Sequence, residues 1–566
     1  MKRKSRILAV LLAVMLVFSA CGKQEPAKTE EAPATEEVAK EEATQEPTQE
    51  PVSEEAEEPV GNPDTLTIAI TKDENTLTPI TYVTGSPGFD TMKFMYDSLF
   101  AVSAENEVIP WMIEEDYEIN DDFTEFKMTL KDGQQWHDGT ELTAEDVIFT
   151  FEYFKDSFTH SRWTPIASKV KAASAEGNVI TLTLEEPDPG FLRASLADMR
   201  IVPKSEFEGV EDPTTLPNMG SGAYKLVEYK TGESYTLEAM DNYFRGTPKV
   251  KTIQMPIIAD PAVIQQALIA GEIATSTSSI GPELVETFMA APNIEVEKSE
   301  GYASTLLIMD NEKAPFDNAD FRLAVSEAIN IDELVEQVCL GYAEKGSSGY
   351  VKKGMDEYVE GLDHVFDVDK ANELLDSIGY TDKDDAGMRK GLDGQEMNLE
   401  LLAAASSPQR IRTAEIIVQQ LEKIGIKATV NSMDSDAVTE LVWPEFETAA
   451  DRSYDMAIFG WSAPVIQKAG AIIAVCSSDF AGVGGQNLSH YKNAEFDALA
   501  AEFLQTVDAA KRAELNAEMQ KIAAVEAPMV TLFFGDTICA VNTQMYDGWV
   551  FAKGTTAVNL FSFLDS

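Results

Sequence analysis

The sequence predicts a large α/β protein, and three observations lead to this fold class. The chain has 566 residues, of which 44% are hydrophobic and 25% are charged, values typical of a globular protein with a sizeable core. From about residue 64 onward, strand-like runs alternate with capped helical segments. No internal repeat is present, so a repeat architecture is not expected.

The strand candidates come first. Each is a short apolar run of the length that strands favour, rich in β-branched or aromatic residues or in alanine and leucine. They are Thr65–Ala69, Val179–Leu184, Tyr235–Ala239, Glu400–Ala403, Met456–Gly460 and Val530–Phe534.

Three helices carry clear start or stop signals. Thr143 and Asp146 fit an acidic form of the capping box, with apolar residues following at helical spacing. Asp367 can cap a second helix, which Gly379 would end. A third helix is expected from Arg410 to Ile424, with Gly425 as its stop.

The net charge and composition narrow the range of functions. Asp and Glu number 97 against 44 Lys and Arg, which gives a formal charge of -53. A nucleic-acid binder needs basic side chains to displace phosphate counterions, so this class is excluded. Four His and four Cys, widely scattered, do not favour a zinc or iron–sulfur site, and no metal or other cofactor is expected.

Catalytic motifs are missing from the sequence. It has no Gly-x-Ser-x-Gly elbow, no His-Glu-x-x-His, no Walker loop and no dinucleotide fingerprint after a strand. The four scattered histidines are expected on the surface or in capping positions, so no catalytic residue is assigned. Cys339, Cys476 and Cys539 lie far apart in apolar contexts, where buried free thiols are favoured over a disulfide.

Residues 1–20 have the pattern of a signal peptide. A basic start precedes the apolar run Ile7–Phe18, which is too short for a hydrocarbon core of about 30 Å. Ser19-Ala20-Cys21-Gly22 resembles the lipobox of bacterial lipoproteins, although Phe18 stands where Leu is usual. The resemblance implies that Cys21 is acylated, and the alternative is an ordinary signal peptide with an incidental cysteine.

Residues 21–62 are expected to form an acidic disordered tether that begins at the lipidated cysteine. Between Lys23 and Asn62 there are 13 Glu against 3 Lys, and large apolar side chains are almost absent. Such a segment cannot bury enough apolar surface to collapse. Its length would hold a globular body away from a lipid anchor.

One long segment and many short ones carry a family resemblance. Trp136–Phe151 predicts a strand end, an Asp-Gly turn, a capped helix start and an amphipathic helix, which is a scaffold element. It closely resembles the signature of solute-binding proteins of peptide-type ABC importers, the family 5 extracellular proteins that bind oligopeptides, dipeptides or nickel. Further segments match in order, with Ala223 where Pro is usual: Tyr96–Phe100, Gly220–Leu226, Asp241–Gly246, Ala259–Ala262, Pro315–Asp317, Gly460–Trp461 and Tyr491–Asp497.

The resemblance implies a two-lobed periplasmic-binding-protein fold, type II and cluster C-like, with a small domain inserted in the first lobe. Ligand would be enclosed between the lobes, and closure would signal to the permease. The implied parts are lobe I at 63–98, 201–300 and 531–566, the inserted domain at 99–200, and lobe II at 301–530.

The same resemblance points to a ligand loop with one important departure. Peptide-binding members carry Gly-Trp-x-Ala-Asp, whose Asp holds the α-ammonium of the peptide, whereas this chain has Pro464 at that position. Leaving a buried charge unpaired costs about 3–5 kcal/mol, so free-amine peptides should bind poorly unless another acid substitutes. Asp310 and Asp536 are the candidates for that replacement.

Other cleft residues are expected from their position in the family pattern. Trp461 would flank the ligand or pack in the core, and Ser462 and Ala463 follow it. The remaining candidates are the first cleft-facing loop, Val83, Thr84 and Gly85, and the hydroxyl-rich segment Ser276, Thr277 and Ser278, which could instead be a solvated loop.

The function implied is that of a monomeric, lipid-anchored binding protein on the outer surface of the cell membrane. It would capture a small polar solute, an oligopeptide or peptide-like compound, and deliver it to an ABC permease with its ATPase subunits. Alternatives are an oligosaccharide or other non-peptide ligand, or a surface sensor without a permease. A secreted hydrolase would need a nucleophile–base pair that the sequence does not contain.

Overall fold

The computed structural model describes residues 63–80, 87–156, 163–210, 212–216, 218–443, 454–463, 467, 470–482 and 485–565. All of them belong to one compact unit. Within these ranges, no helix combines the length and the apolar character needed to cross a membrane.

A five-stranded sheet contains the first strand of the described chain. Strand β1 lies between β11 and β10 and is parallel to both, while β10, β9 and β8 pair in antiparallel fashion. The order is β11 (Thr275–Ser276), β1 (Thr65–Ala69), β10 (Thr252–Pro256), β9 (Ser234–Ala239) and β8 (Tyr224–Lys230).

The segment between β1 and β8 builds its own antiparallel sheet and a hairpin. Helix α2 packs on β6 and β7 and also contacts α3 and α4. The elements are β4 (Glu118–Ile119), β5 (Glu125–Thr129), β7 (Val179–Leu184), β6 (Val170–Glu176), the hairpin β2 (Phe100–Val102) and β3 (Val108–Pro110), and the helices α2 (Ala144–Asp156), α3 (Thr164–Ala167), α4 (Lys204–Phe207) and η1 (Leu192–Leu196).

A six-stranded mixed sheet is formed by the later part of the chain. Neighbouring residues along β13 belong to different core clusters, Leu306 and Ile308 to one and Leu307 and Met309 to the other. Both faces of the sheet are therefore covered, which explains the continuous apolar runs in its strands. Its order is β14 (Ala343–Lys345), β18 (Met529–Gly535), β13 (Ser304–Met309), β17 (Met456–Phe459), β15 (Leu399–Ala404) and β16 (Ala428–Met433).

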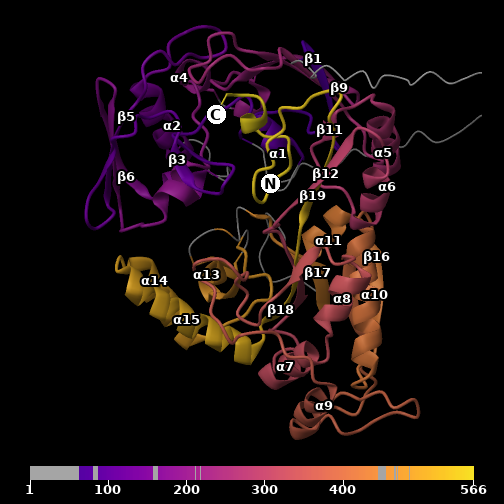
Figure 1. Cartoon of the computed structure of the whole chain (residues 1–566). Helices are drawn as coiled ribbons and strands as arrows, with labels where there is room; N and C mark the ends of the chain where they lie inside the picture. The colour runs from indigo at the N-terminus through magenta and orange to yellow at the C-terminus, as the bar shows by residue number, and fades with distance from the viewer. Residues whose placement is uncertain are drawn as a thin grey trace, which may run out of the picture. The chain divides into compact units, whose positions relative to one another are not determined.

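Helices flank this sheet. Helix α10 (Pro408–Glu422) packs along β15, β16 and β17, and α14 (Ala494–Gln505) packs against α15 (Ala509–Glu526) (Figure 1). The other helices of this part are α7 (Ala319–Glu327), α8 (Ile331–Gln337), α9 (Val368–Ser377), α11 (Ser435–Val442), α13 (Ala471–Cys476) and η5 (Ser478–Phe480).

A two-stranded antiparallel pair, β12 (Ile294–Ser299) with β19 (Thr537–Asn542), lies next to the chain segments that enter and leave the six-stranded sheet. Those two segments touch closely, since a Cβ added at Gly301 would lie 1.7 Å from the Gly535 carbonyl oxygen. Only glycine permits this approach. The remaining elements are α1 (Pro87–Met92), η2 (Pro213–Thr215), α5 (Pro261–Ala270), η3 (Pro282–Leu284), α6 (Val285–Met289) and η6 (Leu560–Ser562).

The predicted elements are confirmed, with small changes at their ends. The Asp146 carboxylate accepts hydrogen bonds from the Thr143 amide at 3.0 Å and from its hydroxyl at 3.1 Å, which caps α2. Asp367 caps α9 through the Lys370 amide. Helix α10 begins two residues earlier than expected because Pro408 fits its first position and Ser407 caps it.

The three cysteines in the described chain are free and buried, as the sequence predicted. Cys339 follows α8, Cys476 ends α13 and Cys539 lies in β19. Burial raises the pKa of the Cys339 thiol to about 12 and that of Cys539 to about 11, and it also raises the pKa of Cys476. All three therefore stay protonated at neutral pH.

Candidate functional site

A cavity of about 370 Å³ is the candidate site. One part of its wall comes from three stretches, residues 89–111, 193–200 and 552–561. Another part comes from the loop after β17. Ala303 and Thr537 also line the cavity, and they belong to the two chain segments next to Gly301 and Gly535 that enter and leave the six-stranded sheet, called the crossing segments below. A cavity of this size, walled by segments far apart in the chain, is typical of a small-molecule site.

Asp97 lines this cavity, is buried, and is the centre of a polar network. Its carboxylate accepts hydrogen bonds from Tyr243 Oη at 2.7 Å, Trp111 Nε1 at 3.0 Å and Ser221 Oγ at 3.0 Å. Burial raises its pKa, while these three hydrogen bonds and the Arg200 charge oppose that rise. Because its carboxylate oxygens already accept three hydrogen bonds from the protein, Asp97 stabilises the cavity wall.

The glycine-rich segment matched to the family signature packs tightly behind that wall. A Cβ at Gly222 would lie 2.4 Å from the Phe94 carbonyl oxygen, and one at Gly220 would lie 1.8 Å from that of Met95. His137 Nδ1 accepts from the Gly220 amide at 3.2 Å, and Nε2 donates to the Gly222 carbonyl at 3.2 Å. Burial lowers the pKa of His137 to about 4, so it is neutral at pH 7.

Cations line the cavity beside Asp97. Lys93 pairs with Asp90 at 2.7 Å, and Arg200 donates to Ser98 Oγ at 3.0 Å. Lys553 lines the cavity and is exposed, and no ionic partner for it is present in the described chain.

Arg193 is held by a neutral partner. Its Nη1 and Nη2 donate to the Asn106 backbone carbonyl at 3.2 and 3.3 Å, and Nη2 also donates to Asn106 Oδ1. Burial lowers the pKa of Arg193 from its ordinary value, but a guanidinium stays charged in proteins.

One hydrogen bond joins the two parts of the wall. Gln467, in the loop after β17, donates through Nε2 to Asn106 Oδ1 at 3.1 Å. The same oxygen accepts from Arg193, so Asn106 is shared between the cation of one wall and the amide of the other.

The loop after β17 is where the sequence placed ligand contacts. Ser462 and Ala463 do line the cavity. Trp461 lies in the core instead, 6% exposed, with its ring 5.1 Å from that of Trp443 and 5.8 Å from that of Phe459. Pro464 lies outside the described residues, and so do Val83, Thr84 and Gly85. Ligand contact by these residues stays a prediction.

Neither of the two acids proposed to replace the missing Asp lines the cavity, although Asp536 directly precedes the lining residue Thr537. Asp310 is buried and bonds to His490 Nδ1 at 2.9 Å, and Asp536 pairs with Lys298 at 3.1 Å. Each already has a charged or polar partner. His490 is itself 5% exposed, so the expectation of a surface or capping role is wrong for this residue, because it is packed against the Asp310 carboxylate.

The hydroxyl-rich segment is mostly engaged within the protein. Ser276 Oγ donates to the Ser278 carbonyl at 3.0 Å, and Ser278 Oγ lies 3.0 Å from Thr71 Oγ1. Thr277 is buried, and its Oγ1 has no hydrogen-bond partner in the described chain. These three residues are not among those lining the cavity.

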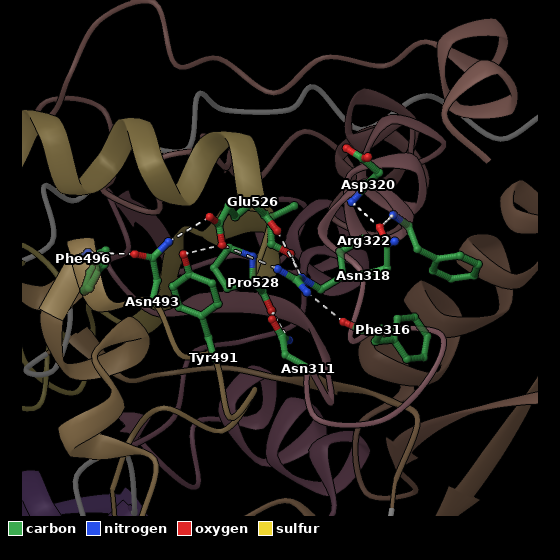
Figure 2. A network of polar contacts seen from close by, with 12 residues as sticks. Asn311, Phe316, Asn318, Asp320, Arg322, Tyr491, Asn493, Phe496, Glu526 and Pro528 are labelled. Atoms are coloured by element: carbon green, nitrogen blue, oxygen red, sulfur yellow. Dashed lines mark hydrogen bonds and ion pairs between the residues drawn. The ribbon is translucent and has the colours of Figure 1, made fainter. Parts of the chain in front are cut away.

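A second buried network, to which the matched segments Pro315–Asp317 and Tyr491–Asp497 contribute, lies elsewhere (Figure 2). Arg322 donates through Nε to the Glu526 carbonyl at 3.1 Å and through Nη1 to the Phe316 carbonyl at 2.8 Å. The Glu526 carboxylate accepts from Tyr491 Oη and Asn493 Nδ2, both at 2.8 Å. None of these residues lines the cavity, so this network holds helices α7 and α15 together.

Sequence reasoning missed Arg193, Lys553, Asn106 and Gln467. They lie in segments without a recognisable motif, and nothing in the local pattern distinguishes them from surface polar residues. Across the described ranges, no three His, Cys, Asp or Glu side chains are grouped to hold a metal ion.

The mixed α/β sheets and the solute-sized cavity define a binding protein for small solutes. The model of "Bacterial extracellular solute-binding proteins, family 5 Middle" matches residues 107–481, and the chain belongs to this family. Solute-binding proteins of this family are substrate-binding components of ABC importers for peptides or nickel-like ligands, and they act outside the cytoplasm.

Known proteins resemble the chain over most of its length. Heme-binding protein A of Haemophilus influenzae is 24% identical, covering 77% of this chain and 81% of that protein. Oligopeptide-binding protein AppA of Bacillus subtilis is 24% identical, covering 74% and 77%. The structure of NikZ from Campylobacter jejuni in complex with Ni(L-His) has a TM-score of 0.76 at 19% identity, covering 89% and 99%, and it shows that the chain has the periplasmic-binding-protein fold.

Proposed function

We propose that this protein is a lipid-anchored receptor that captures an oligopeptide or peptide-like solute in the cavity beside Asp97 and delivers it to an ABC permease. The observation that carries the proposal is the cavity itself, whose walls come from segments on both sides of the Gly301–Gly535 contact. A ligand held there touches both sides at once. This is the arrangement that allows hinge closure to report occupancy.

The proposed domain division follows the sheets. Residues 63–98 and 201–300 supply the five-stranded sheet, 99–200 the inserted domain, and 301–530 most of the six-stranded sheet. Strand β18 pairs with β13 and β14, so we place the final return to lobe I after Gly535, between β18 and β19.

A non-peptide solute is the second candidate, and Pro464 favours it. The family Asp that would receive the α-ammonium is missing, and neither Asp310 nor Asp536 lines the cavity. The similar proteins from Haemophilus influenzae, Bacillus subtilis and Campylobacter jejuni are described as binding heme, an oligopeptide and Ni(L-His), respectively. Such variety within one fold supports testing both classes.

Ligand retained during purification provides the direct test. Native mass spectrometry of the full chain is expected to show a bound species, because a closed binding protein releases its ligand slowly. If the released ligand fragments into amino-acid residues, the result supports a peptide-like ligand. If its mass is that of a sugar or another non-peptide compound, a non-peptide ligand takes the place of the peptide in the proposal. The proposal is contradicted if the protein retains no ligand and if neither a peptide library nor a sugar library raises its melting temperature.

The anchor and location require a separate experiment. We propose that residues 1–20 are removed and that Cys21 is acylated, which holds the protein on the outer surface of the cell membrane. Cells fed an alkyne-labelled fatty acid should label the wild type and not Cys21→Ala. Equal labelling of both proteins contradicts the proposed site.

A further inference from the structure

The charges that line the cavity differ from those of the rest of the chain. Acids outnumber bases 97 to 44 overall. The lining has four cations, Lys93, Arg193, Arg200 and Lys553, against three carboxylates, Asp90, Asp97 and Asp198. A wall that follows the overall composition would carry about two acids for each base, so the cavity is a positive region in an acidic protein.

The three carboxylates are already engaged. Asp90 pairs with Lys93 at 2.7 Å, and the Asp97 carboxylate accepts from Tyr243, Trp111 and Ser221. Asp198 also has a partner. A ligand ammonium entering this cavity would have to displace one of those contacts.

Two of the four lining cations, Arg193 and Lys553, are not paired with a carboxylate. Neither Arg193 nor Lys553 forms an ion pair with a carboxylate of the described chain. Arg193 donates hydrogen bonds to the neutral Asn106 oxygens, and the Asp356 carboxylate acts on its charge only from beyond ion-pair distance. The hydrogen bonds to Asn106 use one Nη1–H and both Nη2–H groups, which leaves Nε–H and the second Nη1–H for an incoming acceptor. Because Asn106 fixes the guanidinium plane, these donors are oriented before a ligand arrives.

From this arrangement we propose that the ligand is an anion whose carboxylate is received by Arg193 and Lys553, and that a free α-ammonium is not required. Charge-assisted hydrogen bonds to a guanidinium are among the strongest that proteins make. In a partly enclosed site, dissolved salt weakens them little. The inference rests on the proposed binding function and specifies its substrate class. Acidic or amino-blocked peptides and small non-peptide acids share this chemistry.

Three probe pools separate the possibilities, each tested by thermal shift and calorimetry on the full chain. The first holds N-acetylated acidic tetrapeptides with free carboxyl ends, and the second holds tetrapeptides with free amines and amidated carboxyl ends. The third holds sugar acids and dicarboxylates. We expect the first or the third pool to raise the melting temperature, which distinguishes a peptide source from a non-peptide source, and the second to leave it unchanged.

The variants Arg193→Gln and Lys553→Gln remove one charge each and retain a hydrogen-bond donor. Each should weaken binding of the active anionic probe by about tenfold to a hundredfold. Matched controls are Arg412→Gln and Lys521→Gln, whose side chains are exposed and paired with Glu415 and Glu518 outside the cavity. These should bind within twofold of the wild type. Lys553 is exposed, so its variant keeps the test valid if Arg193→Gln misfolds.

The outcomes distinguish failure of the anion inference from failure of the proposed receptor function. Binding of the amidated free-amine pool, or equal binding of the first two pools, overturns the anion inference and leaves the receptor function standing. An anionic probe that binds both variants as well as the wild type also overturns the assignment to Arg193 and Lys553. If no pool binds and no ligand is retained on purification, the proposed function fails together with the inference.

Discussion

Two buried networks in this protein are built in the same way but differ in what they adjoin. The Asp97 network joins Trp111, Ser221 and Tyr243 at the cavity lining. The Arg322 network joins Glu526 to the Phe316 carbonyl between helices α7 and α15, away from the cavity lining (Figure 2).

The comparison shows that a buried polar network does not by itself mark a binding site. Both networks satisfy buried charges, which is a requirement of the fold. The unpaired charges that can meet a ligand, on Arg193 and Lys553, come from segments without a signature. Under the proposed anion contact, the residues that maintain the fold and the residues that select the solute are therefore different sets.

Asp97→Ala should have the largest effect on stability. Removing the carboxylate leaves Tyr243, Trp111 and Ser221 without their buried acceptor and takes away one negative charge that acts on Arg200, so unfolding should become easier by about 3–5 kcal/mol. Urea denaturation measures the change. Asp385→Ala, in an exposed turn, is the control and should change stability by about 0.5 kcal/mol or less. Equal effects of the two substitutions would contradict a central role for Asp97.

Arg322→Met sharpens the contrast between the networks. Arg322 is 4% exposed, and its loss leaves buried carbonyl groups without their donor, so we expect a cost of about 2–4 kcal/mol. Ligand affinity of the folded fraction should remain within twofold of the wild type. A large loss of affinity without a loss of stability would show that this network reaches the binding site.

Acid should test the His137 contacts behind the cavity. The folded-state pKa of about 4 lies below the ordinary value of 6.5, so the unfolded chain takes up a proton first as the pH falls. Stability contributed by neutral His137 is thus present above pH 6.5 and is lost progressively toward pH 4. Between pH 7.5 and 5 the wild type should lose about 2 kcal/mol more than His137→Gln, measured by urea denaturation. Identical pH profiles would contradict this role.

Gln467→Ala should have the smallest effect, because it removes only the neutral hydrogen bond to Asn106. A loss of about 1 kcal/mol corresponds to a roughly fivefold weaker affinity for the anionic probe in calorimetry. Gln337→Ala, an exposed residue bonded to Glu333, is the control. If Gln467→Ala binds as tightly as the control, the bond between the two walls does not contribute to capture.

The strands and helices named from the sequence are found in the structure because their signals are local. The cap at Thr143, the cap at Asp367 and the stop at Gly425 depend on residues a few positions apart, and the structure confirms them. The missing charge at Pro464 was also visible directly.

The candidate site was predicted only in part. Ser462 and Ala463 line the cavity, while Trp461, expected beside the ligand or in the core, packs against Trp443. The contact between Gln467 and Asn106 spans 361 positions, and no local pattern indicates which polar residues will meet over such a separation. Burial of His490 against Asp310 could not be predicted for the same reason.

The three buried cysteines provide built-in reporters of motion. Their raised pKa values and their burial in helix ends and in β19 make alkylation in the native state slow. The labelling rate at each position therefore measures how often its surroundings open. Cys539 reports on the strand pair β12–β19 beside the crossing segments. Cys339 follows α8 and Cys476 ends α13, so these two report on helices that flank the six-stranded sheet. A ligand that couples both walls should slow modification of Cys539 in particular, without any label being engineered into the chain.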